Sequence, residues 1–219
     1  VDTSNGNYHL LASSMLINAG HPDSTDSDGT RADMGANPYL NNYSGPTWYT
    51  AESGNDTTAT GASDDPFRSI QAGINFSSDA DSVTVAAGTF VENINFNGKN
   101  ISVIGENRET TIIDGNQSGS VVLFNNNENN NAVLKSFTIK NGSGLDLENN
   151  GDFSGGGIYI FEASPTLIDL ILTDNQASRG SGVYASGATS TFKNLVFVNN
   201  THHRGAFSGV GNNLIMENL

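Results

Sequence analysis

Short apolar runs recur along the C-terminal half of the chain at a fixed spacing. The segment Gly157–Asn175 matches the segment Gly182–Asn200 at an offset of 25 residues throughout. Each copy carries short runs of strand-forming apolar residues, glycine-rich corners and an Asn after the last run. A repeat of this kind is typical of a solenoid in which each copy forms one coil of stacked strands. We therefore predict an all-β solenoid.

The same pattern extends in both directions. The run Val133–Asn141 matches the repeat unit, and an inserted corner at residues 142–153 separates it from the next copy. Met216–Leu219 falls 24 residues after Phe192–Leu195, so we expect the chain to stop inside a coil. Three strands in each coil account for the repeat length. Upstream, short runs bounded by Gly, Asn and Asp predict strands at residues 83–85, 94–96, 101–104, 111–113 and 121–124.

The Asn residues that close the runs have a structural interpretation. Asn tolerates the positive φ of a sharp corner, and its side-chain amide both donates and accepts hydrogen bonds. We expect Asn141, Asn175 and Asn200 to stack as a hydrogen-bonded ladder along one corner. For these three residues the structural role is favoured over ligand binding.

The N-terminal part of the chain differs in pattern, and we predict three segments. Residues 1–40 combine short apolar runs with an acidic stretch. Residues 41–62 contain Gly45 and Pro46 and are predicted to be a linker. Residues 63–219 are predicted to form the solenoid.

A short amphipathic helix is expected at the start of the solenoid. Asp65 can cap it, Pro66 suits the first helical position, and Phe67, Ile70 and Ile74 lie on one face. Such a helix would cover the first coil, whose strand edges and apolar core would otherwise be exposed.

Charge and composition exclude several classes of partner. The chain has 9 Lys and Arg against 23 Asp and Glu, for a formal net charge of -14. This balance argues against nucleic acid as a partner. There is no cysteine, so disulfides and thiol chemistry are excluded. No run of 18 or more apolar residues occurs, so no membrane insertion is expected. The sequence does not set the oligomeric state.

Several segments carry a family resemblance. Residues 47–219 resemble the beginning of a right-handed parallel β-helix of the pectate-lyase-like superfamily, of the secreted bacterial repeat-containing type. The resembling segments are residues 64–74 (DDPFRSIQAGI), 83–94 (VTVAAGTFVENI), 111–115 (TIIDG) and 155–159 (GGGIY). Residues 7–36 resemble the closing segment of another such β-helix. The alternative is that residues 1–40 are an N-terminal extension that folds back onto the solenoid present here.

The resemblance implies a fold and a compartment. The expected fold is a right-handed parallel β-helix with a short N-terminal capping helix. Val1 is not a typical natural start and Leu219 is not a typical natural end. We therefore expect a fragment of a longer secreted chain, located outside the cell or on a bacterial cell surface.

The acidic stretch predicts a calcium site. Asp23, Asp26, Asp28 and Asp33 surround Gly29, and hard oxygen ligands beside a glycine turn suit calcium. The spacing does not fit an EF-hand loop, because two of the positions that supply ligands in such a loop lack the required residue here. A calcium site completed by backbone carbonyls remains one interpretation. The other is an acidic loop whose Asp side chains make Asx turns.

A cationic ridge is the first candidate ligand site. Arg179 and Arg204 are 25 residues apart, so they should stack on consecutive coils, with His202 and His203 beside the second. The planar guanidinium suits the carboxylates of acidic sugars. The alternative is a pair of solvated arginines that offset nearby acids.

Two tyrosines form the second candidate. Tyr159 and Tyr184 share the same offset and could provide an aromatic ledge for the sugar rings of a polysaccharide. They could equally be ordinary strand residues that pack on the core.

Three functions therefore remain open, and the sequence leaves undecided whether the protein is an enzyme. The first is a non-catalytic solenoid that contacts carbohydrate or displays a surface. The second, implied by the resemblance, is a calcium-dependent lyase acting on acidic polysaccharide, in which an Arg or Lys removes a proton and Asp residues hold calcium. It predicts an acidic cluster near Arg179 or Arg204. The third is a structural adhesin or stalk segment without an organised site.

Overall fold

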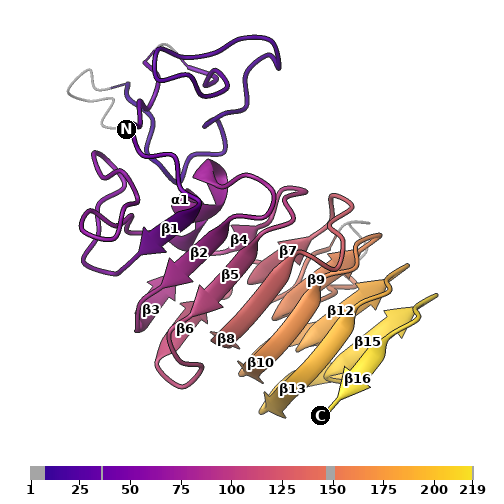
Figure 1. The fold of residues 1–219 in the computed structure, drawn as a ribbon. Helices are drawn as coiled ribbons and strands as arrows, with labels where there is room; N and C mark the ends of the chain where they lie inside the picture. The colour runs from indigo at the N-terminus through magenta and orange to yellow at the C-terminus, as the bar shows by residue number, and fades with distance from the viewer. Residues whose placement is uncertain (1–7, 36, 147–150, 219) are drawn as a thin grey trace.

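The computed structural model describes residues 8–35, 37–146 and 151–218, which form a right-handed parallel β-helix with one short helix near its N-terminal end (Figure 1). All pairings between the named strands are parallel, as the repeat predicts. The elements are β1 (Thr47–Thr50), α1 (Ile70–Phe76), β2 (Ser82–Val85), β3 (Gly88–Val91), β4 (Ile94–Asn95), β5 (Ser102–Gly105), β6 (Thr111–Asp114), β7 (Val122–Phe124), β8 (Val133–Lys140), β9 (Ile158–Phe161), β10 (Thr166–Thr173), β11 (Gln176–Arg179), β12 (Val183–Ser186), β13 (Thr191–Val198), β14 (Thr201–Arg204), β15 (Phe207–Val210) and β16 (Ile215–Glu217).

Each coil contributes strands to separate parallel sheets. A 9-stranded sheet runs in the order β1-β2-β5-β8-β10-β13-β16, with β3 and β6 pairing beside it onto the second half of β8. A 5-stranded sheet runs β15-β12-β9-β7-β4, and β11 pairs with β14. Figure 1 shows these strands stacked from α1 toward the C-terminus. Strand β3 was not among the elements predicted from the apolar runs.

The three eight-residue strands bend at a single residue each. Ser136, Asp169 and Asn194 lie in the middle of β8, β10 and β13 with φ of 64°, 56° and 55°. This left-handed residue lets one continuous strand contribute to two faces of the solenoid. The side chains also stack, because Asn194 Nδ2 donates to Asp169 Oδ1 at 2.6 Å and Arg108 Nη1 donates to the same oxygen at 2.9 Å.

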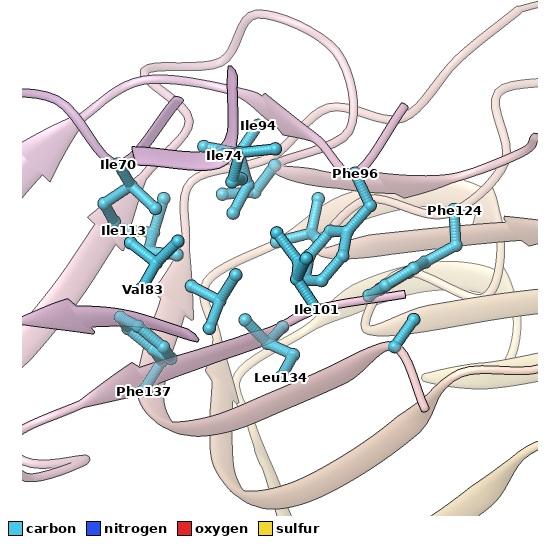
Figure 2. Close-up of a cluster of buried hydrophobic side chains, with 14 of the residues drawn as sticks. Ile70, Ile74, Val83, Ile94, Phe96, Ile101, Ile113, Phe124, Leu134 and Phe137 are labelled. Carbon is cyan, nitrogen blue, oxygen red and sulfur yellow. The ribbon is translucent and has the colours of Figure 1, made fainter. Parts of the chain in front are cut away.

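The core consists of inward side chains stacked in register from coil to coil. One stack continues through Val83, Val103, Leu134, Leu167 and Phe192, which the strand pairing places opposite one another. All five are buried. Because every coil repeats the same inward positions, the core is one continuous apolar column, and burial of this surface stabilises the fold (Figure 2).

The observed strand register differs by one residue from the sequence match of residues 133–141 with residues 167–175. Leu134, not Val133, lies opposite Leu167. A one-residue shift would turn every inward side chain of β8 outward, so burial of Leu134 decides the register. Since Lys140 lies opposite Thr173, Asn141 takes the place of Asp174 rather than that of Asn175.

Of the three Asn residues expected to form a ladder, Asn175 and Asn200 are hydrogen-bonded to each other, whereas Asn141 binds elsewhere. Asn175 is fully buried, and its Nδ2 donates to Asn200 Oδ1 at 3.0 Å and to the Ile139 carbonyl at 3.0 Å. Its Oδ1 accepts from the backbone N–H of Gly142 at 2.9 Å. Asn141 instead has φ of 57° and donates to the Asp114 carboxylate.

Replacing Asn175 by Ala is expected to lower the free energy of unfolding by about 1–3 kcal/mol, because it leaves buried backbone groups without partners. Urea unfolding followed by circular dichroism measures the change. The matched control is Asn130→Ala at an exposed corner, which should stay within about 0.5 kcal/mol of the unaltered protein. Equal stabilities of the two variants would contradict the structural role of Asn175.

Helix α1 begins later than the sequence indicates. Its N-cap is Ser69, whose Oγ accepts from the backbone N–H of Ala72 at 3.3 Å. Asp65 does not cap the helix, because its carboxylate accepts from the Thr60 N–H at 2.9 Å within a turn. Phe67 precedes the helix and lies beside β1, where it bridges Thr50. The expected apolar face is nevertheless buried at all three of its positions, Phe67, Ile70 and Ile74.

Two charged side chains from the next coil hold the ends of α1. The Glu92 carboxylate accepts from the backbone N–H groups of Ile70 at 2.8 Å and Gln71 at 3.1 Å. Lys99 Nζ donates to the carbonyls of Ile74 at 2.8 Å and Asn75 at 2.6 Å. Both side chains thereby pair with backbone groups that a helix leaves without intrahelical partners at its ends.

The N-terminal segment packs against the end of the solenoid that carries α1 (Figure 1). Asn75 Nδ2 donates to the carbonyls of Ala12 and Ser14, and the rings of Tyr39 and Phe76 lie 5.4 Å apart. Residues 41–62, predicted as a linker, include β1, which pairs with β2 as the first strand of the large sheet. The segment boundaries at residues 40 and 62 otherwise stay a prediction.

Candidate functional site

A pocket of about 250 Å³ lies on the outer side of the 5-stranded sheet, over β9 and β12. It collects Arg179, Tyr159 and Tyr184, which are three of the residues predicted to bind a ligand. Among the described residues, its lining is Leu145, Asp152, Ser154, Tyr159, Phe161, Arg179 and Tyr184.

The inserted corner between β8 and β9 forms one wall of this pocket. Leu145 and Ser154 bridge each other in antiparallel fashion, with both N–H···O distances at 2.9 Å. Ser154 also bridges Arg179 of β11 in parallel. These backbone contacts bring Asp152, two residues before Ser154, beside the end of β11.

The two arginines are stacked as the spacing predicts. Arg179 lies directly opposite Arg204 in the pairing of β11 with β14. The next residue, Gly180, has φ of 56°, and a Cβ there would clash with the Val183 carbonyl oxygen. Glycine thus permits the sharp corner that carries the chain from β11 to β12.

Both arginines face the same carboxylate. Arg179 Nη2 forms an ion pair with Asp152 Oδ2, and Arg204 Nη1 lies 3.9 Å from the same oxygen. The hydrogen bond that Arg179 donates to the Asp152 carboxylate raises the pKa of the guanidinium, which therefore stays charged. Arg179 Nε is buried without a hydrogen-bond partner, whereas the Arg204 side chain is 63% exposed.

The tyrosine ledge is present but mostly covered. The rings of Tyr159 and Tyr184 stack with centroids 5.5 Å apart and an interplanar angle of 15°. Tyr159 is only 4% exposed and Tyr184 9%, whereas Phe161 is 41% exposed and stacks on Tyr159 at 6.5 Å. The open aromatic surface of the pocket is thus the ring of Phe161, which the sequence analysis missed. Its outward position two residues after Tyr159 in the same strand was the available signal.

The histidines are placed only by their backbone. His202 lies opposite Ala177 in the pairing of β14 with β11, and His203 follows it. The side chains of both residues lie outside what the structure describes, so their role in ligand binding stays a prediction.

The acidic N-terminal stretch uses its carboxylates for hydrogen bonds to the backbone. Asp28 accepts from Thr30 and Asn41, Asp33 accepts from Asn18 and Tyr39, and Asp26 accepts from the N–H of Asp33. The corresponding distances are between 2.7 and 3.0 Å.

The pKa values in this stretch reflect the same surroundings. Burial raises the pKa of Asp33, and the nearby charges of Asp26 and Asp28 raise it further. Burial also acts to raise the pKa of Asp28, but hydrogen bonds from Asn41 and Thr30 outweigh it and lower the pKa. Asp23 instead extends into solvent beside His21, with Nδ1 and Oδ2 3.8 Å apart. These bonds are those of an Asx-rich loop, and calcium binding there stays a prediction.

A calcium-dependent lyase would need an acidic cluster near the arginines. Within residues 8–35, 37–146 and 151–218, no group of three or more His, Cys, Asp or Glu side chains could hold a metal ion. Asp169 lies on another face, bound to Arg108 and Asn194, and Asp174 accepts from the Thr173 hydroxyl. Asp152 is the carboxylate that the structure brings to both arginines.

Within residues 8–35, 37–146 and 151–218, no helix is long and apolar enough to cross a bilayer.

Comparisons with known proteins give limited further information. No protein-family model and no curated protein matches the chain. Among solved structures, pectin methylesterase PemA from Erwinia chrysanthemi shares 13% sequence identity at a TM-score of 0.41, covering 68% of this chain and 53% of its own. A pectin methylesterase mutant in complex with a hexasaccharide shares 15% identity at a TM-score of 0.43, covering 68% of this chain and 48% of its own. The chain thus spans about half the length of these structures, and at these values the similarity carries no argument about activity.

Proposed function

We propose that this protein is an extracellular β-helix module that contacts an acidic polysaccharide at the pocket over β9 and β12, without catalysing a reaction. The observation that supports this most directly is the meeting of Arg179, Arg204 and the exposed ring of Phe161 around one pocket. Guanidinium groups recognise carboxylates through paired hydrogen bonds, and an aromatic face packs against the apolar face of a sugar ring. The two kinds of contact together select a sugar that carries a carboxylate.

The charge state of Arg179 favours binding over a role as catalytic base. An arginine can remove a proton from a substrate only in its neutral form, and a general base works best when its pKa lies near the working pH. The hydrogen bond that Arg179 donates to Asp152 raises the pKa of Arg179, which moves this group further from that range. A permanently charged guanidinium is suited to holding a carboxylate in place.

The binding of a galacturonate tetrasaccharide, measured by isothermal calorimetry, tests the proposal. We expect Arg204→Ala to weaken binding by about tenfold or more, because one charge-assisted hydrogen bond is worth about 1.5–3 kcal/mol. Phe161→Ala should weaken binding of the acidic and the neutral tetrasaccharide alike. Both substituted side chains are exposed, so folding should be unaffected.

The control is Arg68→Ala, which removes the same charge from an exposed position close to α1. It should leave the affinity unchanged. Failure of the unaltered protein to bind any tetrasaccharide would refute the proposal and favour a structural stalk. Release of an unsaturated sugar product during the titration would instead favour a lyase.

A further inference from the structure

The Asp152 carboxylate has a position that the proposed binding function does not explain. It sits inside the pocket and forms the ion pair with Arg179, while Arg204 approaches the same oxygen at 3.9 Å. A carboxylate placed between two guanidinium groups is the arrangement expected for a bound acidic ligand. Here the chain itself supplies that carboxylate.

The hydrogen bonding around Asp152 leaves donors unused. A guanidinium has five N–H donors, and Arg179 Nε is buried without an acceptor. Burying such a donor without a partner is unfavourable, because its lost hydration is not replaced. A carboxylate that met the Nε and Nη2 edge of Arg179 with both oxygens would satisfy it, which the present contact with Asp152 does not.

We infer that Asp152 occupies the carboxylate position of the pocket in the free protein, so that an acidic sugar binds by displacing it from Arg179 and Arg204. This inference rests on the proposed function and concerns what sets affinity at the same site. Asp152 then acts as an internal competitor. It weakens the binding of single carboxylates and leaves neutral sugars, which do not use the arginines, unaffected.

The experiment compares Asp152→Asn with the unaltered protein. Asn keeps the size of the side chain but removes its charge, so the affinity for the galacturonate tetrasaccharide should rise by about tenfold. The affinity for a neutral galactose tetrasaccharide should not change. Asp174→Asn is the matched control, because it removes the same charge at a corner residue with φ of 54°, a conformation that Asn tolerates, and should have no effect. Thermal unfolding confirms that each variant is folded, and Asp152→Ser replaces Asp152→Asn if that variant is not.

The outcomes separate the two hypotheses. If the unaltered protein binds the acidic tetrasaccharide and the Asp152 variants bind it equally or more weakly, the competitor role is wrong and the proposed function stands. If neither the unaltered protein nor the variants bind it, both are wrong. An equal gain in Asp174→Asn would assign the effect to net charge and would also overturn the inference.

Discussion

Replacing Phe124 by Ala is expected to lower the free energy of unfolding by about 3–5 kcal/mol. Phe124 is fully buried in β7, and its ring lies 4.3 Å from that of Phe96 in the preceding coil (Figure 2). Truncation removes the ring and leaves a cavity inside the apolar column, which strands on both sides hold at fixed spacing and prevent from collapsing. Urea unfolding followed by circular dichroism, which reports on all the sheets, measures the loss.

Phe161→Ala provides the control for this prediction. Phe161 belongs to the neighbouring strand β9, but its ring points outward and is 41% exposed. Its truncation should change stability by less than about 1 kcal/mol, since 41% of its surface already meets water in the folded protein. A Phe124→Ala variant as stable as Phe161→Ala would show that the core column does not carry the stability of the fold.

The second large effect is a dependence of stability on pH through Glu92. Burial raises the pKa of Glu92 from 4.5 to about 7, against the opposing hydrogen bonds from Ile70 and Gln71. Folding therefore favours the protonated carboxyl, and the folded protein binds more protons than the unfolded chain between these two values. The contribution of Glu92 to the free energy of unfolding is thus fully present below pH 4.5 and is lost as the pH rises to about 7. At about 1.36 kcal/mol for each pKa unit, the loss amounts to about 3 kcal/mol.

The fluorescence of Trp48, the single tryptophan, measures this effect near α1. Its ring is buried and lies 5.6 Å from that of Phe76 in the helix. Glu92→Gln removes the titrating group, so its unfolding free energy should fall less than that of the unaltered protein between pH 4.5 and 7. Glu106→Gln, at an exposed Glu that also accepts a backbone N–H, should keep the original dependence. Identical pH profiles for all three proteins would contradict the assignment to Glu92.

Lys99 affects the free energy of unfolding at higher pH, and its effect has the opposite dependence on pH. Burial lowers its pKa from 10.5 to about 8, so folding favours the neutral amine. Its contribution is full above pH 10.5 and is lost as the pH falls to about 8. Glu92 and Lys99, at the two ends of α1, therefore both contribute least to the free energy of unfolding near pH 7 to 8.

The sequence by itself determined the stacking of coils. The offset of 25 residues predicts the pairing of β10 with β13 and of Arg179 with Arg204, because a constant repeat can stack its inward side chains in only one way. It also identified Phe67, Ile70 and Ile74 as buried. These properties follow from apolar periodicity, which is written locally along the chain.

Only the tertiary structure decided features that depend on contacts between coils of unequal length. The insertion between β8 and β9 breaks the period, so the alignment of Asn141 failed by one residue and burial of Leu134 set the register instead. The same insertion brings Asp152 to the arginines. Likewise, Glu92 and Lys99 reach α1 from the next coil. No local pattern encodes such contacts, because hydrogen bonds and ion pairs between side chains depend on where the backbone of a distant segment is placed.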